Sequence, residues 1–332
     1  MKKRTLIWAL VAVMVLVLAA CGKNNNSNNA SPSASGQASP SAKEDPKTII
    51  YVNPLVGHPV FIQAHEGLKD AAKKYGYKIV EVGPSTIDAT AMVKELENAV
   101  VQKADAIVTV PLNWEAFGNV YKKIKDAGIP IVNLNSDTPA DTRLAYIGTD
   151  AATYGKDAAD KLASKMNGKG NVAIMMVALD IQVQAEMKDA IVKRFEEKYP
   201  DMKVSVVEAD KGDMLVGVQK FTDIFKANPD VNAVIALNAN AGVEAAKAMK
   251  ELGLKDKITV LGIDDIQETV DNIKDGYIWA SKVQNFYRMG YQAVESIHSH
   301  FAGDTVTSIM DSGTIFLTKD SVDTYKESLK VF

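Results

Sequence analysis

Short apolar runs rich in β-branched residues alternate with longer amphipathic stretches over most of the chain. The first cycle predicts a strand at 48–53 (TIIYVN), a helix at 59–75, a strand at 77–82 (YKIVEV), a helix at about 86–102 and a strand at 106–110 (AIVTV). Pro59 suits the first turn of the first helix, and Gly76 marks its end. This βαβ rhythm predicts a parallel sheet covered by helices on both faces.

The same plan returns in the second half of the chain. KYGYKIVEV at 74–82 is echoed by KYPDMKVSVVE at 198–208, and ADAIVTVP at 104–111 is echoed by VNAVIALN at 231–238. Each copy then adds a further apolar run, IPIVNLN in the first half and KITVLGID in the second. The sequence therefore predicts an α/β fold with two similar doubly wound parallel-sheet domains.

The N-terminal residues follow a different pattern, a positive start followed by one continuous apolar run. Three cationic residues at 2–4 precede the run at 6–20, which ends in small residues, so we expect a signal peptide over 1–20. This run is too short for a membrane span, which would need about 20 apolar residues. The tetrapeptide LAAC, which ends at Cys21, resembles the bacterial lipobox, whose cysteine is acylated and becomes the first mature residue. We expect a lipid anchor on Cys21, and a non-lipidated signal with a chance cysteine is the alternative.

A polar, low-complexity segment separates this signal from the periodic part of the chain. It is mostly Asn, Ser, Ala, Pro and Gly, which cannot bury enough apolar surface to order itself, so we expect 21–46 to carry the lipid and form a flexible linker. The net charge of −3 includes three cationic signal residues, so the mature chain would carry about −6, which argues against a nucleic-acid partner. A single cysteine excludes an internal disulfide.

Polar side chains follow the apolar runs of both halves. Ligands of doubly wound sheets bind beyond the carboxyl ends of the strands, so these positions are candidate contacts. They are Asn53, His58, Asn113, Trp114, Asn135, Ser136, Asp137, Asp180, Asn238, Asn240, Asp264 and Asp265. Asn and Asp are also common in turns and at helix N-caps, which would explain part of the set. So many amides and carboxylates nevertheless favour a cleft that bridges ligand hydroxyls.

Arginine is scarce in the chain after the signal. Its three arginines, at 143, 194 and 288, do not directly follow a strand, whereas a phosphate or carboxylate site would usually use this residue. A neutral polyhydroxylated ligand fits better, because aromatic rings can cover its apolar face while Asn, Asp and Gln bridge its hydroxyls. The stacking candidates are Phe61, Trp114, Trp279, Phe286 and Tyr287.

Residues 47–332 resemble the type I periplasmic sugar-binding proteins, and among them the ribose-binding group. The segments that carry the resemblance are GHPVFIQAHEGLKDAAKKYGY, AGIPIVNLNSD, NPDVNAVIALNANAGVEAAKAM, ITVLGIDD and DGYIWASKVQ. The resemblance implies two domains joined by a three-segment hinge. Transferred by position, it implies ligand contacts at His58, Phe61, Asn135, Ser136, Asn238, Asp264 and Gln284.

The chain also departs from the ribose-binding group. That group has Asn where this chain has His58, an Asp-Arg pair where it has Asn135 and Ser136, an arginine near Gln184 and an aromatic residue near Lys211. The ligand therefore stays open among pentoses, hexoses, deoxy sugars and related polyols. Our secondary contact candidates are Asn113, Trp114, Asp137, Asp180, Gln184 and Lys211.

The resemblance also implies three crossings between the domains, which set the domain limits. The N-terminal domain would combine 47–149 with 285–313, and the C-terminal domain would combine 150–284 with 314–332. A hinge of this kind can close around a ligand and bury it.

Asp264 follows the apolar run ITVLGI and matches the ligand-binding aspartate of the family. We expect it to be the principal charged acceptor for ligand hydroxyls. In the alternative, Asp264 caps a helix that starts near Gln267, and Asp265 faces the ligand.

We expect an extracytoplasmic, lipid-anchored binding protein that delivers a small neutral sugar or polyol to the permease subunits of an ABC importer. A lipoprotein receptor that reports to a membrane sensor kinase is the alternative, and the sequence does not separate the two. A sugar-responsive repressor would begin with a helix-turn-helix instead of a signal and linker. An enzyme is disfavoured because no G-x-G-x-x-G follows a strand and no Walker A motif occurs. We expect no cofactor, and no metal site because His65 has no second ligand at a suitable spacing.

Overall fold

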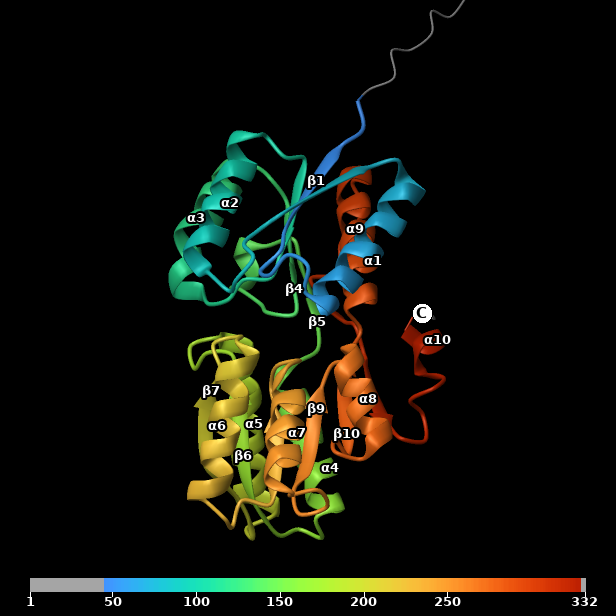
Figure 1. The fold of residues 1–332 in the computed structure, drawn as a ribbon. Coiled ribbons are helices and arrows are strands. Elements are labelled where there is room, and N and C mark those ends of the chain that lie inside the picture. Colours follow the sequence, from blue (N-terminus) through green and yellow to red (C-terminus); the bar gives the residue numbers. More distant parts are fainter. Residues whose placement is uncertain (1–44, 330–332) are drawn as a thin grey trace, which may run out of the picture. The chain divides into compact units, whose positions relative to one another are not determined.

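The computed structural model describes residues 45–329, so the predicted signal peptide, Cys21 and most of the predicted linker lie outside the described residues. Within that range, twelve strands form two six-stranded sheets, and helices cover both faces of each sheet (Figure 1). This arrangement confirms the predicted α/β fold with two similar, parallel-dominated halves. None of the helices in the described range is long and apolar enough to cross a membrane.

The first lobe is built on a sheet with the order β11-β5-β4-β3-β1-β2, in which all neighbouring strands are parallel. Its strands are β1 (Thr48–Val52), β2 (Lys78–Val82), β3 (Ala106–Thr109), β4 (Ile131–Leu134), β5 (Ala145–Gly148) and β11 (Ile309–Asp311). One face is covered by α1 (Pro59–Tyr75) and α9 (Phe286–Ala302), and the other by α2 (Ala89–Val101) and α3 (Trp114–Asp126). A short 3-10 turn, η1 (Ala140–Thr142), precedes β5.

The second lobe is built on a sheet with the order β12-β10-β9-β8-β6-β7, in which only β12 is antiparallel to its neighbour. Its strands are β6 (Gly170–Met176), β7 (Met202–Ala209), β8 (Ala233–Ala236), β9 (Thr259–Ile263), β10 (Ala280–Gln284) and β12 (Thr314–Thr318). One face is covered by α4 (Ala151–Lys165) and α5 (Gln182–Lys198). The other is covered by α6 (Met214–Ala227), α7 (Ala241–Leu252), α8 (Gln267–Asp275) and α10 (Tyr325–Leu329).

Successive residues of a strand pack into the cores on opposite faces of the sheet. In β1, Ile49 and Tyr51 pack with residues of α1 and α9, whereas Ile50 and Val52 pack with residues of α2 and α3. Both faces are therefore apolar, which explains why the strands read as continuous apolar runs instead of alternating with polar residues.

The elements of the first predicted cycle match the structure to within one residue at their ends, except at one helix start. α1 spans the predicted residues, and Gly76 closes it in the left-handed conformation with a φ of 73°. α2 begins at Ala89 and not near Thr86, because the Asp88 side chain accepts a hydrogen bond from the backbone N–H of Ala91 and caps the helix there.

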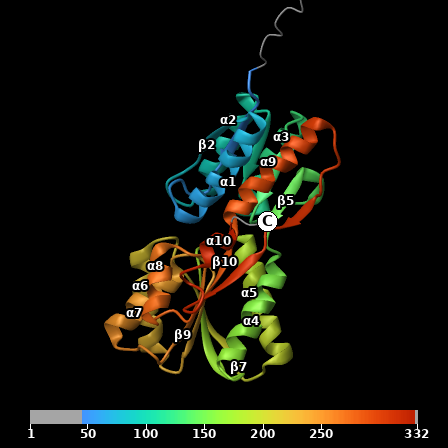
Figure 2. The same ribbon diagram turned by 90° about the vertical axis from the view of Figure 1, so that its right-hand side faces the viewer.

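Two helices that are far apart in the sequence, α1 and α9, lie side by side on the first sheet (Figures 1 and 2). Gly67 of α1 and Gly290 of α9 lie where the two backbones approach each other closely. A Cβ atom on Gly67 would overlap the backbone oxygen of Tyr287, and one on Gly290 would overlap that of Ala64. Only glycine permits this approach, which fixes the middle of α1 beside the first turns of α9.

The chain passes between the two lobes three times in the described range: between β5 and α4, between β10 and α9, and between β11 and β12. These passages give the topology that a three-segment connection requires. The domain limits at 149, 284 and 313, and the hinge function of these segments, stay predictions.

Candidate functional site

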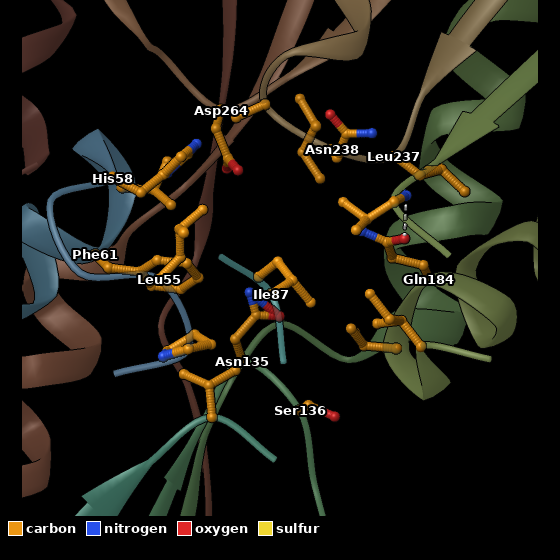
Figure 3. A pocket seen from close by; sticks show the side chains of 18 of the residues that line it. Leu55, His58, Phe61, Ile87, Asn135, Ser136, Gln184, Leu237, Asn238 and Asp264 are labelled. Carbon is orange, nitrogen blue, oxygen red and sulfur yellow. Dashed lines mark hydrogen bonds between the residues drawn. The ribbon is translucent and has the colours of Figure 1, made fainter. Parts of the chain in front are cut away.

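A cavity of about 120 Å³ lies between the carboxyl ends of the strands of the two lobes (Figure 3). The first lobe lines it with residues that follow β1, β2, β3 and β4. The second lobe lines it with residues that follow β6, β7, β8 and β9, and with the last residue of β10. This is the edge at which doubly wound sheets bind ligands.

All seven residues predicted as ligand contacts from the resemblance line this cavity. They are His58, Phe61, Asn135, Ser136, Asn238, Asp264 and Gln284. Figure 3 shows His58, Asp264 and Asn238 along one side of the cavity, and Asn135 and Ser136 along the side that faces them. The structure thus brings the predicted residues together, and their contact with a ligand stays a prediction.

Asp264 is the only acidic residue among the described residues that line the cavity. It is 5% exposed, and its φ of 60° is a conformation that Asp tolerates better than most residues. Its Oδ1 accepts hydrogen bonds from the backbone N–H and the Nε2 of Gln284, at 3.3 and 3.4 Å. Burial, and then the charge of Asp265, raise the pKa of Asp264 to about 7. Because both hydrogen bonds go to Oδ1, Oδ2 is available to a ligand.

The structure does not support a helix-capping role for Asp264. α8 begins after Ile266, and no side chain caps it. Asp265 is held elsewhere, because its Oδ1 accepts a hydrogen bond from Gln63 and its Oδ2 accepts one from Tyr325, both at 2.9 Å. Asp264 is therefore the carboxylate that faces the cavity.

Three polar atoms of the cavity lining are buried and have no hydrogen-bond partner within the described part of the chain. They are His58 Nδ1, Asn135 Oδ1 and Gln284 Oε1. An unpaired buried polar group costs about 1–3 kcal/mol, so these atoms are expected to find partners in a bound ligand. Burial lowers the pKa of His58, so its ring is neutral at pH 7.

Asn238 is held by the protein through both ends of its amide. Its Oδ1 accepts hydrogen bonds from the backbone N–H groups of Asn240 and Ala241, each at 3.0 Å, at the start of α7. Its Nδ2 donates to Asp210 at 2.6 Å, which leaves one N–H for a ligand.

Behind Asn238, Asp210 has an acidic neighbour, Glu244. Burial, and then the charge of Asp210, raise the pKa of Glu244 to about 9, so Glu244 is neutral at pH 7.

Two phenyl rings form an apolar wall beside these polar groups. The rings of Phe61 and Phe286 meet edge to face, with centroids 5.6 Å apart, and both line the cavity. The ring of His58 lies 5.7 Å from that of Phe61. Three of the predicted stacking residues do not line the cavity: Trp114, Trp279 and Tyr287.

Of the six secondary candidates, only Gln184 lines the cavity, and its Oε1 accepts a hydrogen bond from the backbone N–H of Val177 at 2.9 Å. Asn113 instead caps α3, and Asp137 forms an ion pair with the buried Arg143. The candidates outside the lining also include Trp114, Asp180 and Lys211. Within residues 45–329, no group of His, Cys, Asp and Glu side chains could hold a metal ion.

Contacts between the lobes adjoin the cavity and were not predicted from the sequence. Gln63 of α1 donates to Asp265, 202 residues away, and the backbone N–H of Gln182 donates to the oxygen of Leu112 at 3.2 Å. The apolar core beneath α1 and α9 also includes Val243 of the second lobe. The lobes are therefore joined beside the cavity by both polar and apolar contacts.

Comparison with known proteins agrees with this architecture. A family model described as periplasmic binding protein domain matches residues 49–305. The ribose import binding protein of Escherichia coli strain K12 is 26% identical over 279 residues, which cover 82% of this chain and 90% of that protein.

Two solved structures extend the comparison. An ABC transporter solute binding protein from Burkholderia graminis C4D1M, in complex with D-arabinose, has a TM-score of 0.81 and 27% identity, and the match covers 86% of this chain and 99% of that chain. The structure named XylFII-LytSN complex has a TM-score of 0.78 and 25% identity, and the match covers 83% of this chain and 98% of that chain.

Proposed function

Since the chain belongs to the periplasmic binding protein domain family, whose model matches residues 49–305, we propose that it captures a small neutral sugar or polyol between its lobes and delivers it to an ABC importer. It is a substrate-binding protein and not an enzyme. We propose that the ligand contacts are His58, Phe61, Asn135, Ser136, Asn238, Asp264 and Gln284, with a further contact at Gln184.

The unpaired buried polar atoms beside a buried carboxylate are the observation that carries this proposal. Hydroxyl groups can donate to Asp264 Oδ2, Asn135 Oδ1 and Gln284 Oε1, and they can also accept from a neighbouring N–H. An anionic ligand is disfavoured, because the described residues that line the cavity include no Lys or Arg and do include Asp264. A neutral ligand with several hydroxyls satisfies the site without burying an unpaired charge.

The comparisons support a ligand of pentose or hexose size. The relative from E. coli is named for ribose, and the solute binding protein from B. graminis was solved with D-arabinose. This chain has His58, Asn135 and Ser136 where the ribose-binding group has different residues, so we do not assign ribose.

We also propose that the protein acts outside the cytoplasmic membrane and is held there by a lipid on Cys21, which lies outside the described residues. Its family is named for the periplasm, and the LAAC tetrapeptide supports the anchor. Mass spectrometry of the mature N-terminus should find an acylated Cys21, and Cys21→Ser should release the protein from the membrane or leave the signal uncleaved. An unmodified cysteine, or cleavage elsewhere, would remove the anchor from this proposal.

The second candidate function is sensing, in which the loaded protein reports to a membrane receptor. It is favoured by the likeness to the structure named XylFII-LytSN complex, in which a protein of this fold is paired with another protein. Deletion of the gene separates the two functions. Loss of labelled-sugar uptake supports transport, whereas normal uptake with loss of sugar-induced transcription supports sensing.

The proposal is tested by a thermal-shift screen of the purified full chain against pentoses, hexoses, deoxy sugars and polyols. A ligand that binds only the folded state at 100 times its Kd adds about 2.7 kcal/mol of stability, which raises Tm by roughly 5 °C. At least one neutral sugar or polyol should produce this rise, and Asp264→Asn should reduce it by half or more at the same ligand concentration. If no neutral sugar or polyol raises Tm while a charged solute does, the proposal of a neutral ligand is wrong.

A further inference from the structure

We infer that the ligand carries an apolar edge, a methyl group or a deoxy carbon, at the end of the cavity away from Asp264. This inference rests on the proposed function, because it specifies which member of the sugar class the same cavity takes. It comes from the distribution of polar and apolar groups along the second sheet.

Three polar side chains of the second lobe come from adjacent strands at one part of the sheet edge. Gln284 ends β10, Asp264 follows β9 and Asn238 follows β8, and these three strands are neighbours in the sheet. His58 of the first lobe lies beside Asp264 on this side of the cavity (Figure 3). Two acceptors for ligand hydroxyls, Asp264 Oδ2 and Gln284 Oε1, are therefore gathered at this end, and a third, Asn135 Oδ1, lies on the side that faces them.

The other end of the cavity is apolar. β6 is the next strand after β8 and is followed by Val177, and neighbouring strands are about 4.8 Å apart, so β6 lies about 10 Å from β9. Further apolar side chains of both lobes line the cavity: Ile87, Leu112, Ile181, Val183, Met187 and Leu237. Ile87 and Val177 meet at Gly212, where a Cβ atom would lie 3.9 Å from each of them.

Gln184 is the polar side chain that contacts Val177 at this end. Its Oε1 is already occupied by the backbone N–H of Val177 (Figure 3), so only its NH₂ group remains for a ligand. That group donates hydrogen bonds and cannot accept one from a hydroxyl. A ligand hydroxyl placed against Ile87 and Val177 would therefore find no acceptor for its proton on Gln184.

This arrangement predicts a preference for deoxy sugars over their hydroxylated parents. An apolar pocket disfavours an added hydroxyl by up to about 100-fold. The NH₂ group of Gln184 would recover part of this loss, so we expect a preference of about 10-fold or more.

The test uses titration calorimetry of the purified full chain with matched sugars that differ by one hydroxyl. Suitable pairs are D-fucose with D-galactose, L-fucose with L-galactose, L-rhamnose with L-mannose, and 6-deoxy-D-glucose with D-glucose. Where a pair binds, the deoxy member should bind about 10-fold or more tightly. The inference is overturned if the hydroxylated parent binds as well or better, or if only fully hydroxylated sugars bind. If a deoxy sugar binds more weakly than its parent, the inference fails and the proposed sugar-binding function stands. If no sugar binds, both the inference and the proposed function fail.

A variant of the apolar end gives an independent measurement. Val177→Thr keeps the side-chain shape and adds a hydroxyl to the lining, so it should reduce the preference for the deoxy member several-fold. The matched control is Val207→Thr in β7, where the residue is also partly buried but does not line the cavity. It should leave the preference unchanged. An unchanged preference in Val177→Thr would contradict the placement of the apolar edge.

Discussion

Replacement of Asp264 by Asn removes the one acidic group of the described cavity lining and keeps the shape of the side chain. The amide oxygen of Asn can still accept the hydrogen bonds from Gln284, so the local structure should persist. What is lost is a charged acceptor for ligand hydroxyls. A hydrogen bond to a charged group is worth about 1.5–3 kcal/mol, so loss of one such bond should weaken binding by at least about 10-fold.

The same substitution has an opposite effect on the empty protein. The pKa of Asp264 is about 7 in the folded protein and 3.8 in the reference state, so the folded protein holds its proton more tightly than the unfolded chain does. Ionisation of Asp264 therefore destabilises the empty protein. Its cost to the free energy of unfolding is absent below about pH 4 and rises to about 4 kcal/mol above about pH 7. Asp264→Asn should therefore unfold at an equal or higher temperature than the parent near neutral pH, with no gain near pH 4.

Titration calorimetry at about pH 8, where Asp264 is mostly ionised, measures the first effect, and thermal unfolding without ligand measures the second. Asp230→Asn is the matched control. Asp230 precedes β8, at the end of the strand opposite the cavity, and accepts a hydrogen bond from Asn171 at 2.8 Å. It should leave affinity unchanged. If Asp264→Asn binds the sugar as tightly as the parent, the carboxylate is not the principal acceptor.

Three further predictions concern pH, packing and closure. Affinity of the parent should fall about 10-fold between about pH 8 and pH 6 as Asp264 gains a proton, and a flat calorimetric profile would contradict its role. Gly67→Ala should lower the free energy of unfolding by about 1–3 kcal/mol in urea titrations, because the added Cβ meets the backbone of α9. Gly118→Ala is the control and should cost less, because its Cβ meets only a side chain. Equal losses in the two variants would show that the helix contact is not the cause. Tyr325→Phe removes the hydrogen bond to Asp265 beside the contact between lobes and should weaken sugar binding several-fold in calorimetry, and an unchanged Kd would show that this bond does not stabilise the closed form.

Much of the fold could be predicted from the sequence because each element carries its own local signal. The continuous apolar runs identify strands that are buried on both faces, and Gly76 closes a helix at the position where a left-handed residue is needed. The start of α2 was placed too early, because the side chain of Asp88 decides it and the apolar pattern does not. Local signals of this kind do not depend on distant partners.

The site was predictable only in part, because a position after a strand says which edge a residue occupies and not where its side chain points. Asp264 and Asp265 are adjacent, yet one faces the cavity and the other binds Gln63 and Tyr325. Asp137 was a reasonable candidate by position, but Arg143 draws its carboxylate into an ion pair. The apolar lining could not be recognised in advance, because residues such as Ile87 and Met187 resemble ordinary core residues in the sequence.

A crystal structure of the protein with the sugar that gives the largest thermal shift tests the central claim most directly. We predict the sugar in the cavity between the lobes, with a hydroxyl within hydrogen-bond distance of Asp264 Oδ2 and others on Asn135 Oδ1 and Gln284 Oε1. Density for the sugar elsewhere on the protein, or in the cavity without a hydroxyl on Asp264, would contradict the account.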